Sequence, residues 1–175
     1  MDHLVCCDRR MVTEAVDNIK NQYTSIYVRE NNFQYFRKIQ KNKNIKQLPD
    51  IPYHGEFKRD RPDHWGSGPY AVLVASTLCD DILLLGFDLY GNNDKINNVY
   101  KETANYNKKD SAAVDPSYWI HQIAQVMRYT PYKKYTVIND RNWQMPKEWS
   151  LDNVVLKNFE DVSVDNKYLC SIIIL

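Results

Sequence analysis

The chain has 175 residues, of which 43% are hydrophobic and 26% are charged, a composition typical of one globular domain with a sizeable core. Its 23 lysines and arginines nearly balance its 22 aspartates and glutamates, so the net charge gives no reason to expect a nucleic-acid partner. The sequence has neither an apolar stretch of about 18 residues, as a membrane span requires, nor a signal segment. We therefore expect a cytoplasmic protein without a membrane span.

The cysteines give no indication of a metal site. Cys6 and Cys7 are adjacent, while Cys79 and Cys170 stand alone. None of them belongs to a CxxC pair or to the Cys/His spacing that a zinc site needs. We expect reduced, structural thiols, no metal and no cofactor.

The first elements form a strand, helix, strand unit. An apolar strand is predicted at residues 3–7, a helix with one apolar face at about 10–21, and a second strand at 25–28. Two parallel strands joined by a helix require a right-handed crossover. From residue 30 to residue 62 the pattern is weak: a short helix near 33–40 is followed by a polar loop marked by prolines.

The centre of the chain carries the clearest pattern. Ser67 and Gly68 stand in a glycine-flanked loop and begin an apolar helix. The apolar run at residues 82–85 predicts an interior parallel strand that is covered on both faces. Asp88 and Tyr90 follow this strand, at the carboxyl end where open α/β sheets bind ligands.

The last third alternates again between helix and strand. A polar, asparagine-rich segment at 91–115 precedes a predicted helix at 116–129 and strands at 134–138 and 154–157. The apolar tail at 169–175 is either a last strand or an irregular terminus. Alternating strands and helices predict an α/β sandwich of three layers with a mostly parallel sheet, built as a single domain.

The residues that could carry chemistry share a position at strand carboxyl ends or on adjacent loops. They are Asp8, Ser67, Asp88, Tyr90, Tyr100, Tyr106 and His121. Their position predicts a cleft without naming a reaction. The GxSxG spacing of a serine nucleophile is absent, and so are the dinucleotide fingerprint GxGxxG and the P-loop.

The run SGPYAVLVASTLCDDILLLGFDLYG resembles the bacterial sialyltransferases, which use a CMP-activated sugar and adopt a Rossmann-like fold without a metal. That family shows a Ser-Gly loop, an apolar helix, an apolar strand and a Gly-Ile-Asp-Phe-Tyr-like end. The likeness extends more loosely to the sequence YWIH that ends at His121. With NNVYKETANY and VDPSYWIHQ, the chain is more similar still to phage and marine-metagenome proteins distantly related to those enzymes.

The resemblance implies a role for several residues. Ser67 and Gly68 would contact the nucleotide sugar, while Tyr90 and Tyr100 would hydrogen-bond the phosphate as its bond to the sugar breaks. His121 would be the general base that takes a proton from the hydroxyl of a glycan acceptor. Ser67, Tyr90 and His121 are then expected to face one cleft.

The chain also departs from the family pattern at its beginning. The family starts with a strand and a Gly-Asn-Gly-Pro-Ser-like turn around the nucleotide, followed by a strand that carries an asparagine. Here Cys7 and Asp8 either replace that asparagine or match a later strand, and we favour the later strand, so that the family's N-terminal strands are missing.

Three functions follow from this comparison. The first is a glycosyltransferase-like domain, inactive if it needs the missing segment, in which Asp8 and Asp88 are further substrate-binding candidates. The second is a non-catalytic viral binding module on the same fold, and the third is a nucleotide-handling enzyme of another reaction class. A missing strand would also expose a sheet edge, where we expect pairing with another copy of the chain.

Overall fold

The structure is a computed structural model, and it describes residues 2–90, 95, 108, 110–161 and 172–174. The chain divides into two compact units, which are treated separately below. Unit 1 contains Met1–Leu78 and Val164–Leu175, and unit 2 is Cys79–Ser163. Every named strand pairing in either unit is parallel, which confirms the predicted α/β class with mostly parallel strands in a Rossmann-like arrangement.

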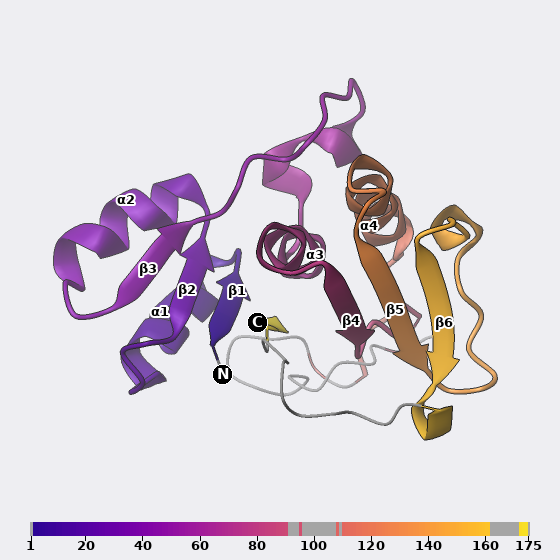
Figure 1. The fold of residues 1–175 in the computed structure, drawn as a ribbon. Helices are drawn as coiled ribbons and strands as arrows, with labels where there is room; N and C mark the ends of the chain where they lie inside the picture. Colours follow the sequence, from indigo (N-terminus) through magenta and orange to yellow (C-terminus); the bar gives the residue numbers. More distant parts are fainter. Residues whose placement is uncertain (1, 91–94, 96–107, 109, 162–171, 175) are drawn as a thin grey trace. The chain divides into compact units, whose positions relative to one another are not determined.

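Unit 1 is built on a four-stranded sheet in the order β3-β2-β1-β7 (Figure 1). The strands are β1 (His3–Cys6), β2 (Ser25–Val28), β3 (Asn44–Gln47) and β7 (Ile172–Ile174). The first two confirm the predicted strand, helix, strand unit. The strand interpretation of the apolar tail is also correct, because β7 pairs with β1.

Helices join the strands of unit 1 and cover the sheet. They are α1 (Arg9–Asn18), α2 (Glu30–Ile39) and α3 (Ser67–Leu78). One face of the sheet packs on α1 and α2 through a cluster that contains Leu4, Cys6, Ile26, Val28, Met11, Val12, Ala15, Val16 and Phe36. Successive strand residues point to opposite faces, and Val5 and Tyr27 of the other face are buried as well. Both faces of the central strands are therefore covered, as in most parallel sheets.

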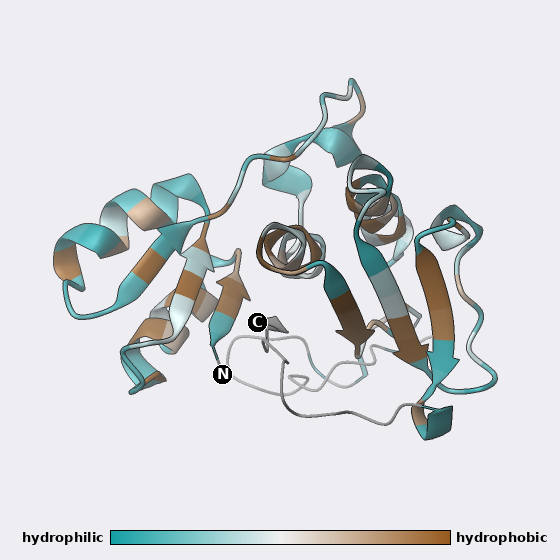
Figure 2. Cartoon of the chain, viewed as in Figure 1, coloured by the Kyte–Doolittle hydropathy of each residue, from teal (hydrophilic) through white to brown (hydrophobic). Residues whose placement is uncertain are grey.

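The third helix, α3, contacts β1 and β7. Figure 2 shows hydrophobic residues on most sides of this helix, which agrees with the burial of seven of its residues from Pro69 to Ser76. Two short 3-10 turns, η1 (Lys58–Asp60) and η2 (Pro62–His64), lead into it. The prediction of an apolar helix that begins at Ser67 is confirmed.

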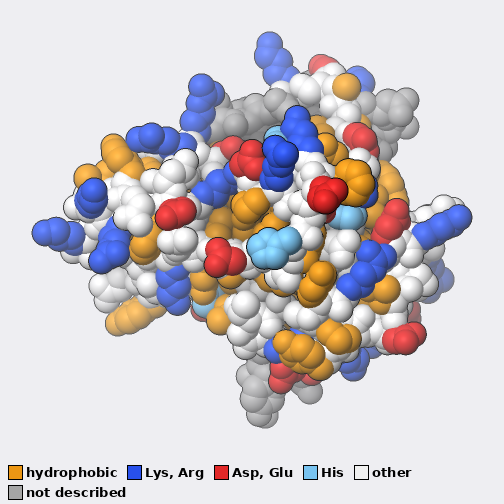
Figure 3. All heavy atoms as spheres, turned by 90° about the horizontal axis from the view of Figure 1, so that it is seen from above, with side chains coloured by type: hydrophobic (Ala, Val, Ile, Leu, Met, Phe, Trp, Pro, Cys, Tyr) orange, Lys and Arg blue, Asp and Glu red, His pale blue; other side chains and the backbone are white. Residues whose placement is uncertain are grey.

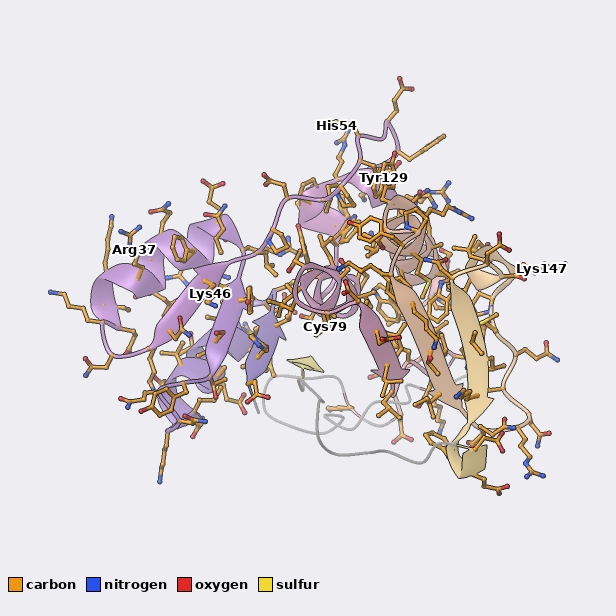
Figure 4. The ribbon with its side chains drawn as sticks, viewed as in Figure 1. Arg37, Lys46, His54, Cys79, Tyr129 and Lys147 are labelled. Carbon is orange, nitrogen blue, oxygen red and sulfur yellow. The ribbon has the colours of Figure 1, made fainter. Side chains whose placement is uncertain are left out.

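Strand β3 was not predicted, because its sequence Asn-Ile-Lys-Gln is polar. It lies at the edge of the sheet and attaches to β2 partly through polar side chains. The amide of Asn44 donates to the hydroxyl of Ser25 at 2.9 Å, and the ammonium of Lys46 lies 5.5 Å from the centre of the Tyr27 ring (Figure 4). Hydrophobic periodicity cannot detect a strand that is held in this way.

Unit 2 is built on a three-stranded sheet in the order β4-β5-β6. The strands are β4 (Asp81–Leu85), β5 (Lys134–Asn139) and β6 (Val154–Asn158), and the helix is α4 (Ser117–Tyr129). Two 3-10 turns flank β6, namely η3 (Lys147–Trp149) and η4 (Phe159–Asp161). All four predicted elements are present, each with one boundary that differs by a single residue.

The prediction that β4 is covered on both faces is wrong. Ile82 and Leu84 are buried, but Leu83 is 36% exposed and Leu85 is 55% exposed. The reason is the strand order, because β4 is an edge strand and β5 occupies the centre, where residues 135–139 are all buried. An apolar run therefore marked a strand correctly but not its place in the sheet.

Two general features complete the description. Among the described helices, none is both long enough and apolar enough to cross a membrane. On the face of the molecule seen in Figure 3, lysine and arginine side chains are interspersed with aspartate and glutamate. This mixture agrees with the near-zero net charge of the sequence.

Candidate functional site

The carboxyl ends of β1 and β2 in unit 1 bring together polar groups from four segments. We call this group, which consists of Cys7, Asp8, Arg29, Asn32 and Ser67, the β1–β2 edge. The backbone N–H of Cys7 donates to the Ser67 hydroxyl oxygen at 3.1 Å, and the amide of Asn32 donates to the Cys7 carbonyl at 3.5 Å. The first residue of α3 and a buried residue of α2 therefore hold the backbone that leaves β1.

Arg29 follows β2 directly and is half-buried. Its guanidinium donates to the carbonyl oxygen of Asp63 at 2.9 Å and to that of Trp65 at 2.6 Å. Within the described part of the chain, no carboxylate forms an ion pair with Arg29. The carbonyl oxygens orient the guanidinium but leave its full positive charge at this edge.

The two adjacent thiols beneath this edge are not activated. Burial raises the pKa of Cys6 from 9.0 to about 12. Burial also raises the pKa of Cys7, although the nearby Arg29 and Ser67 oppose this effect. Both sulfurs are therefore protonated at neutral pH. Nucleophilic chemistry would need a thiolate instead. Cys79 is a free cysteine like these two among the described residues.

Asp8 lies between β1 and α1 and is exposed. Its backbone carbonyl accepts the N–H of Val12 at 2.9 Å, but its carboxylate makes no capping hydrogen bond to the helix. Arg9 and Arg10 occupy the first turn of α1, where no acidic residue is present. The surroundings of Asp8 are therefore basic.

The carboxyl end of β4 in unit 2 forms a second polar group. Gly86 has a φ of 75° and Leu89 a φ of 63°. The left-handed conformation costs a residue such as leucine about 1–2 kcal/mol, and such strain often accompanies binding sites. The indole N–H of Trp143 donates to the carbonyl oxygen of Asp88 at 2.8 Å, which fixes the strained turn against the segment that follows β5.

Three aromatic rings connect this turn with α4. The ring centres of Tyr90 and Trp143 are 6.3 Å apart, and those of Trp143 and Trp149 are also 6.3 Å apart. The indole N–H of Trp149 donates to the carbonyl of Ile120 at 2.9 Å. His121 is the next residue, and it is half-buried rather than a solvated side chain on the helix surface. Tyr90 and the peptide before His121 are thus joined through packed rings within unit 2.

Two further groups at this end have perturbed environments. Burial and the negative charge of Glu148 raise the pKa of Tyr90, so its phenol is a hydrogen-bond donor at neutral pH. Asn139, the last residue of β5, is 4% exposed. Its side-chain oxygen accepts the N–H of Asp140 at 2.9 Å, whereas its amide nitrogen has no hydrogen-bond partner among the described residues. We call the group Asp88, Tyr90, Asn139 and Trp143 the β4–β5 edge.

The structure divides the predicted site residues between the two units. Asp8, Ser67 and Gly68 are in unit 1, whereas Asp88, Tyr90 and His121 are in unit 2. Tyr100 and Tyr106 lie outside the described residues. The expectation that Ser67, Tyr90 and His121 face one cleft therefore stays a prediction.

Sequence reasoning missed several residues that the structure brings to these edges. They are Arg29, Asn32, Asn139 and Trp143. Arg29 and Asn139 stand at the carboxyl ends of strands that were correctly predicted, so the rule that selected Asp8 and Asp88 could have found them. Asn32 and Trp143 act through contacts with backbone carbonyls, and no sequence spacing encodes such contacts.

Among the described residues there is no group of three or more histidine, cysteine, aspartate or glutamate side chains that could hold a metal ion. Comparisons with protein-family models, with curated proteins and with solved structures gave no match. The resemblance to sialyltransferases, the CMP-sugar donor, the glycan acceptor and the pairing with a second copy therefore stay predictions.

Proposed function

We propose that this chain is a sialyltransferase-like glycosyltransferase domain that transfers a sugar from a CMP-activated donor to an acceptor hydroxyl, and that its β1–β2 edge binds the nucleotide. The observation that carries the proposal is the cationic Arg29 beside Ser67 at a parallel-sheet edge. Ligands of open α/β sheets bind at this edge, and a planar guanidinium suits the oxygens of a phosphate.

The surroundings of Arg29 favour an anion in particular. Arg29 donates to two neutral carbonyl oxygens and also contacts the protonated thiol of Cys7, so these partners orient the charge without neutralising it. The two arginines in the first turn of α1 add positive charge, which the exposed carboxylate of Asp8 offsets in part. Ser67, which begins α3, already contacts the backbone of Cys7 at this edge, and the sialyltransferase resemblance implies a nucleotide-sugar contact for the same serine.

The chemical step follows from the resemblance. The acceptor oxygen attacks the anomeric carbon of the sugar, the bond between that carbon and the phosphate oxygen breaks, and CMP leaves as an anion. His121 takes the proton of the acceptor hydroxyl. The resemblance also implies that Tyr90, which the raised pKa keeps protonated, would donate a hydrogen bond to the leaving phosphate.

Thermal stability in the presence of nucleotides tests the proposal. A saturable rise in Tm with CMP or CMP-sialic acid would support it, because a ligand that binds only the folded state stabilises that state. No response to any cytidine nucleotide would favour the non-catalytic binding module, and a rise with purine nucleotides alone would favour another nucleotide-handling enzyme. Either result would reject the proposal.

A pair of variants tests whether the CMP-induced rise in Tm depends on the β1–β2 edge. Arg29→Lys keeps the positive charge but loses the planar guanidinium with its paired N–H donors. It should therefore reduce the CMP-induced rise in Tm. Arg37→Lys is the matched control in the same unit. Arg37 projects from α2 (Figure 4), and its guanidinium lies 5.6 Å from the Phe33 ring, so this variant should respond to CMP like the wild type.

A second variant tests the chemistry separately. His121→Ala should abolish sugar transfer while the fold and the CMP-induced rise in Tm persist. The half-buried His121 side chain is smaller than the tryptophans on which the packing of unit 2 depends. Transfer at the wild-type rate in this variant would reject His121 as the base.

A further inference from the structure

We propose that the exposed side of α2 binds the surface of an anionic lipid bilayer, with Tyr35 and Ile39 entering the headgroup region and the neighbouring cations contacting the headgroups. We call the group Arg9, Tyr35, Lys38 and Ile39 the α2 face. All four residues belong to unit 1. The inference goes beyond the proposed function and does not rest on it.

The α2 face contains two exposed apolar side chains. Tyr35 is 45% exposed and Ile39 is 54% exposed. Residues separated by about one helical turn lie on the same side of a helix, so these two side chains form one apolar strip. The buried side of α2, which includes Asn32 and Phe36, is a different one. The helix therefore presents a second apolar strip that stays exposed in the described part of the chain.

Positive charge surrounds this strip. Residues 37–46 contain five lysines and arginines and no aspartate or glutamate. Lys38 lies on α2, and the guanidinium of Arg9 from α1 lies 4.4 Å from the centre of the Tyr35 ring. Within the part of the chain that the structure describes, neither cation forms an ion pair. Lysine and arginine side chains gather at the α2 end of the molecule (Figure 3, left).

Not every cation of this segment belongs to the α2 face. The Lys43 ammonium donates to the carbonyl oxygen of Ile19. Lys46 lies over the Tyr27 ring, on the sheet face opposite to α1 and α2 (Figure 4). The exposed acids of α1 also reduce the positive charge that this helix adds. The charge of the α2 face therefore depends mainly on α2 itself and on the residues that directly follow it.

The side chains of this face favour a bilayer over a nucleic acid. A nucleobase stacks on an open aromatic face, but Arg9 covers one face of the Tyr35 ring, and Phe36 contacts this ring edge-to-face at 5.0 Å between ring centres. Ile39, the more exposed apolar residue, is aliphatic and gives a base nothing to stack on. Tyrosine and an aliphatic residue beside lysine and arginine are typical of helices that lie in the interface of an anionic membrane.

Co-sedimentation of the whole chain with lipid vesicles tests the inference. We expect saturable binding to vesicles of phosphatidylcholine mixed with phosphatidylserine. Vesicles of phosphatidylcholine alone should bind more than about tenfold more weakly, because each cation near an anionic surface contributes about 1 kcal/mol, or about fivefold in affinity. Added salt should weaken the binding, since it screens these charges.

A pair of lysine variants assigns the binding to the α2 face. Lys38→Gln should weaken binding to the anionic vesicles by about fivefold. Lys46→Gln is the matched control, because Lys46 belongs to the same basic segment but lies on the opposite face of the sheet. This control should bind like the wild type.

A second pair tests the apolar contact. Ile39→Asn should weaken binding by about fivefold, since burial of a half-exposed isoleucine contributes about 1 kcal/mol. Leu78→Asn is the control: Ile39 and Leu78 are the last residues of α2 and α3, and Leu78 is 44% exposed. A circular dichroism spectrum like that of the wild type verifies the fold. If Ile39→Asn does not fold, the two lysine variants still decide the inference.

Several outcomes would overturn the inference. They are no binding to the anionic vesicles, equal affinities of Lys38→Gln and Lys46→Gln, unchanged binding of a folded Ile39→Asn, and binding of single-stranded DNA or polyglutamate in place of vesicles. Vesicle binding without any response to CMP would support the α2 face and reject the transferase function. A response to CMP without vesicle binding would do the reverse, so the two proposals can fail independently.

Discussion

The β1–β2 edge and the β4–β5 edge occupy the same place in two parallel sheets but differ in chemistry. The first presents the cation Arg29 with its charge left unneutralised, together with the hydroxyl of Ser67. The second presents the exposed ring of Tyr90, with Asp88 beside it and the carboxylate of Glu148 near its hydroxyl. The same sheet position can therefore carry different side-chain chemistry, and under the proposed function the residues after each strand would determine which ligand is favoured.

The same contrast extends below the surface of the two edges. In unit 1, hydrogen bonds to backbone carbonyl and amide groups hold the edge. In unit 2, packed indole rings hold it. We therefore expect the two edges to respond differently to substitution and to pH.

Loss of a tryptophan ring should have the largest effect, and it should be confined to unit 2. Trp149 is fully buried, packs on Trp143 and donates to the Ile120 carbonyl. Trp149→Ala should lower the free energy of unfolding by about 3–5 kcal/mol, the usual cost of a large cavity. Urea unfolding, monitored through the hydrogen exchange of β5 amides, measures this loss of unfolding free energy. A loss no greater than that of Trp143→Ala, at a half-buried position, would contradict the role of Trp149.

Alkaline pH should act mainly on unit 1. Burial raises the pKa of Cys6 from 9.0 to about 12 and that of Tyr70 from 10.0 to about 12. A folded-state pKa above the unfolded value means that the folded state binds the proton more tightly. Stability is then complete below about pH 9 and falls as the pH rises toward 12, by on the order of a few kcal/mol.

Urea unfolding at a series of pH values, followed through β1 amides, measures this loss. The double variant Cys6→Ala with Tyr70→Phe removes two of the raised groups and should reduce the dependence, while Cys7 and Tyr53, whose pKa values burial also raises, remain. Tyr90→Phe in unit 2 is the matched comparison and should leave the slope for β1 unchanged. An undiminished slope in the double variant would show that other groups cause the loss.

Removal of the guanidinium should have a somewhat smaller effect on unit 1. Arg29→Ala loses two charge-assisted hydrogen bonds to carbonyl oxygens, and the free energy of unfolding should fall by about 2–3 kcal/mol. Arg37→Ala, at an exposed position of α2, should cost less than about 0.5 kcal/mol. Equal losses in these two variants, measured by urea unfolding, would remove Arg29 as the organiser of the β1–β2 edge.

The Ser67 hydroxyl should give the smallest effect. Ser67→Ala leaves the Cys7 N–H without its acceptor, at a cost of about 1 kcal/mol. Hydrogen exchange at the Cys7 amide should become about fivefold faster, which corresponds to that free energy. Thr13→Ala serves as the control, since Thr13 is exposed and its hydroxyl donates to the Arg9 carbonyl of its own helix. Unchanged exchange at Cys7 in Ser67→Ala would show that the hydroxyl does not hold this backbone.

Most elements could be predicted from the sequence, because their apolar residues recur with helical or strand periodicity. The polar strand β3 could not, because its backbone pairing with β2 is supplemented by side-chain contacts of Asn44 and Lys46 rather than by an apolar pattern. Nor could the division of the strands into two sheets, because periodicity reports which residues are buried and not which strands are neighbours. Leu83 and Leu85 illustrate this, as they read like an interior strand but lie on an edge.

The candidate site was predictable to the same extent. The position of Asp8, Ser67, Asp88 and Tyr90 near strand carboxyl ends follows from topology and was found. The functions of Arg29 and Trp143 depend on bonds to carbonyl oxygens distant in the sequence, and only the folded backbone brings these partners together. The unpartnered amide of a buried asparagine is likewise a property of the fold alone.

The central claim is that the β1–β2 edge binds a cytidine nucleotide, and amide chemical shifts during a titration with CMP test it most directly. We expect saturable shifts at Cys7, Asp8, Arg29 and Ser67, and much smaller shifts from the same titration in Arg29→Lys. Saturating CMP that leaves these four amides unmoved, or that moves them equally in Arg29→Lys, would contradict the claim.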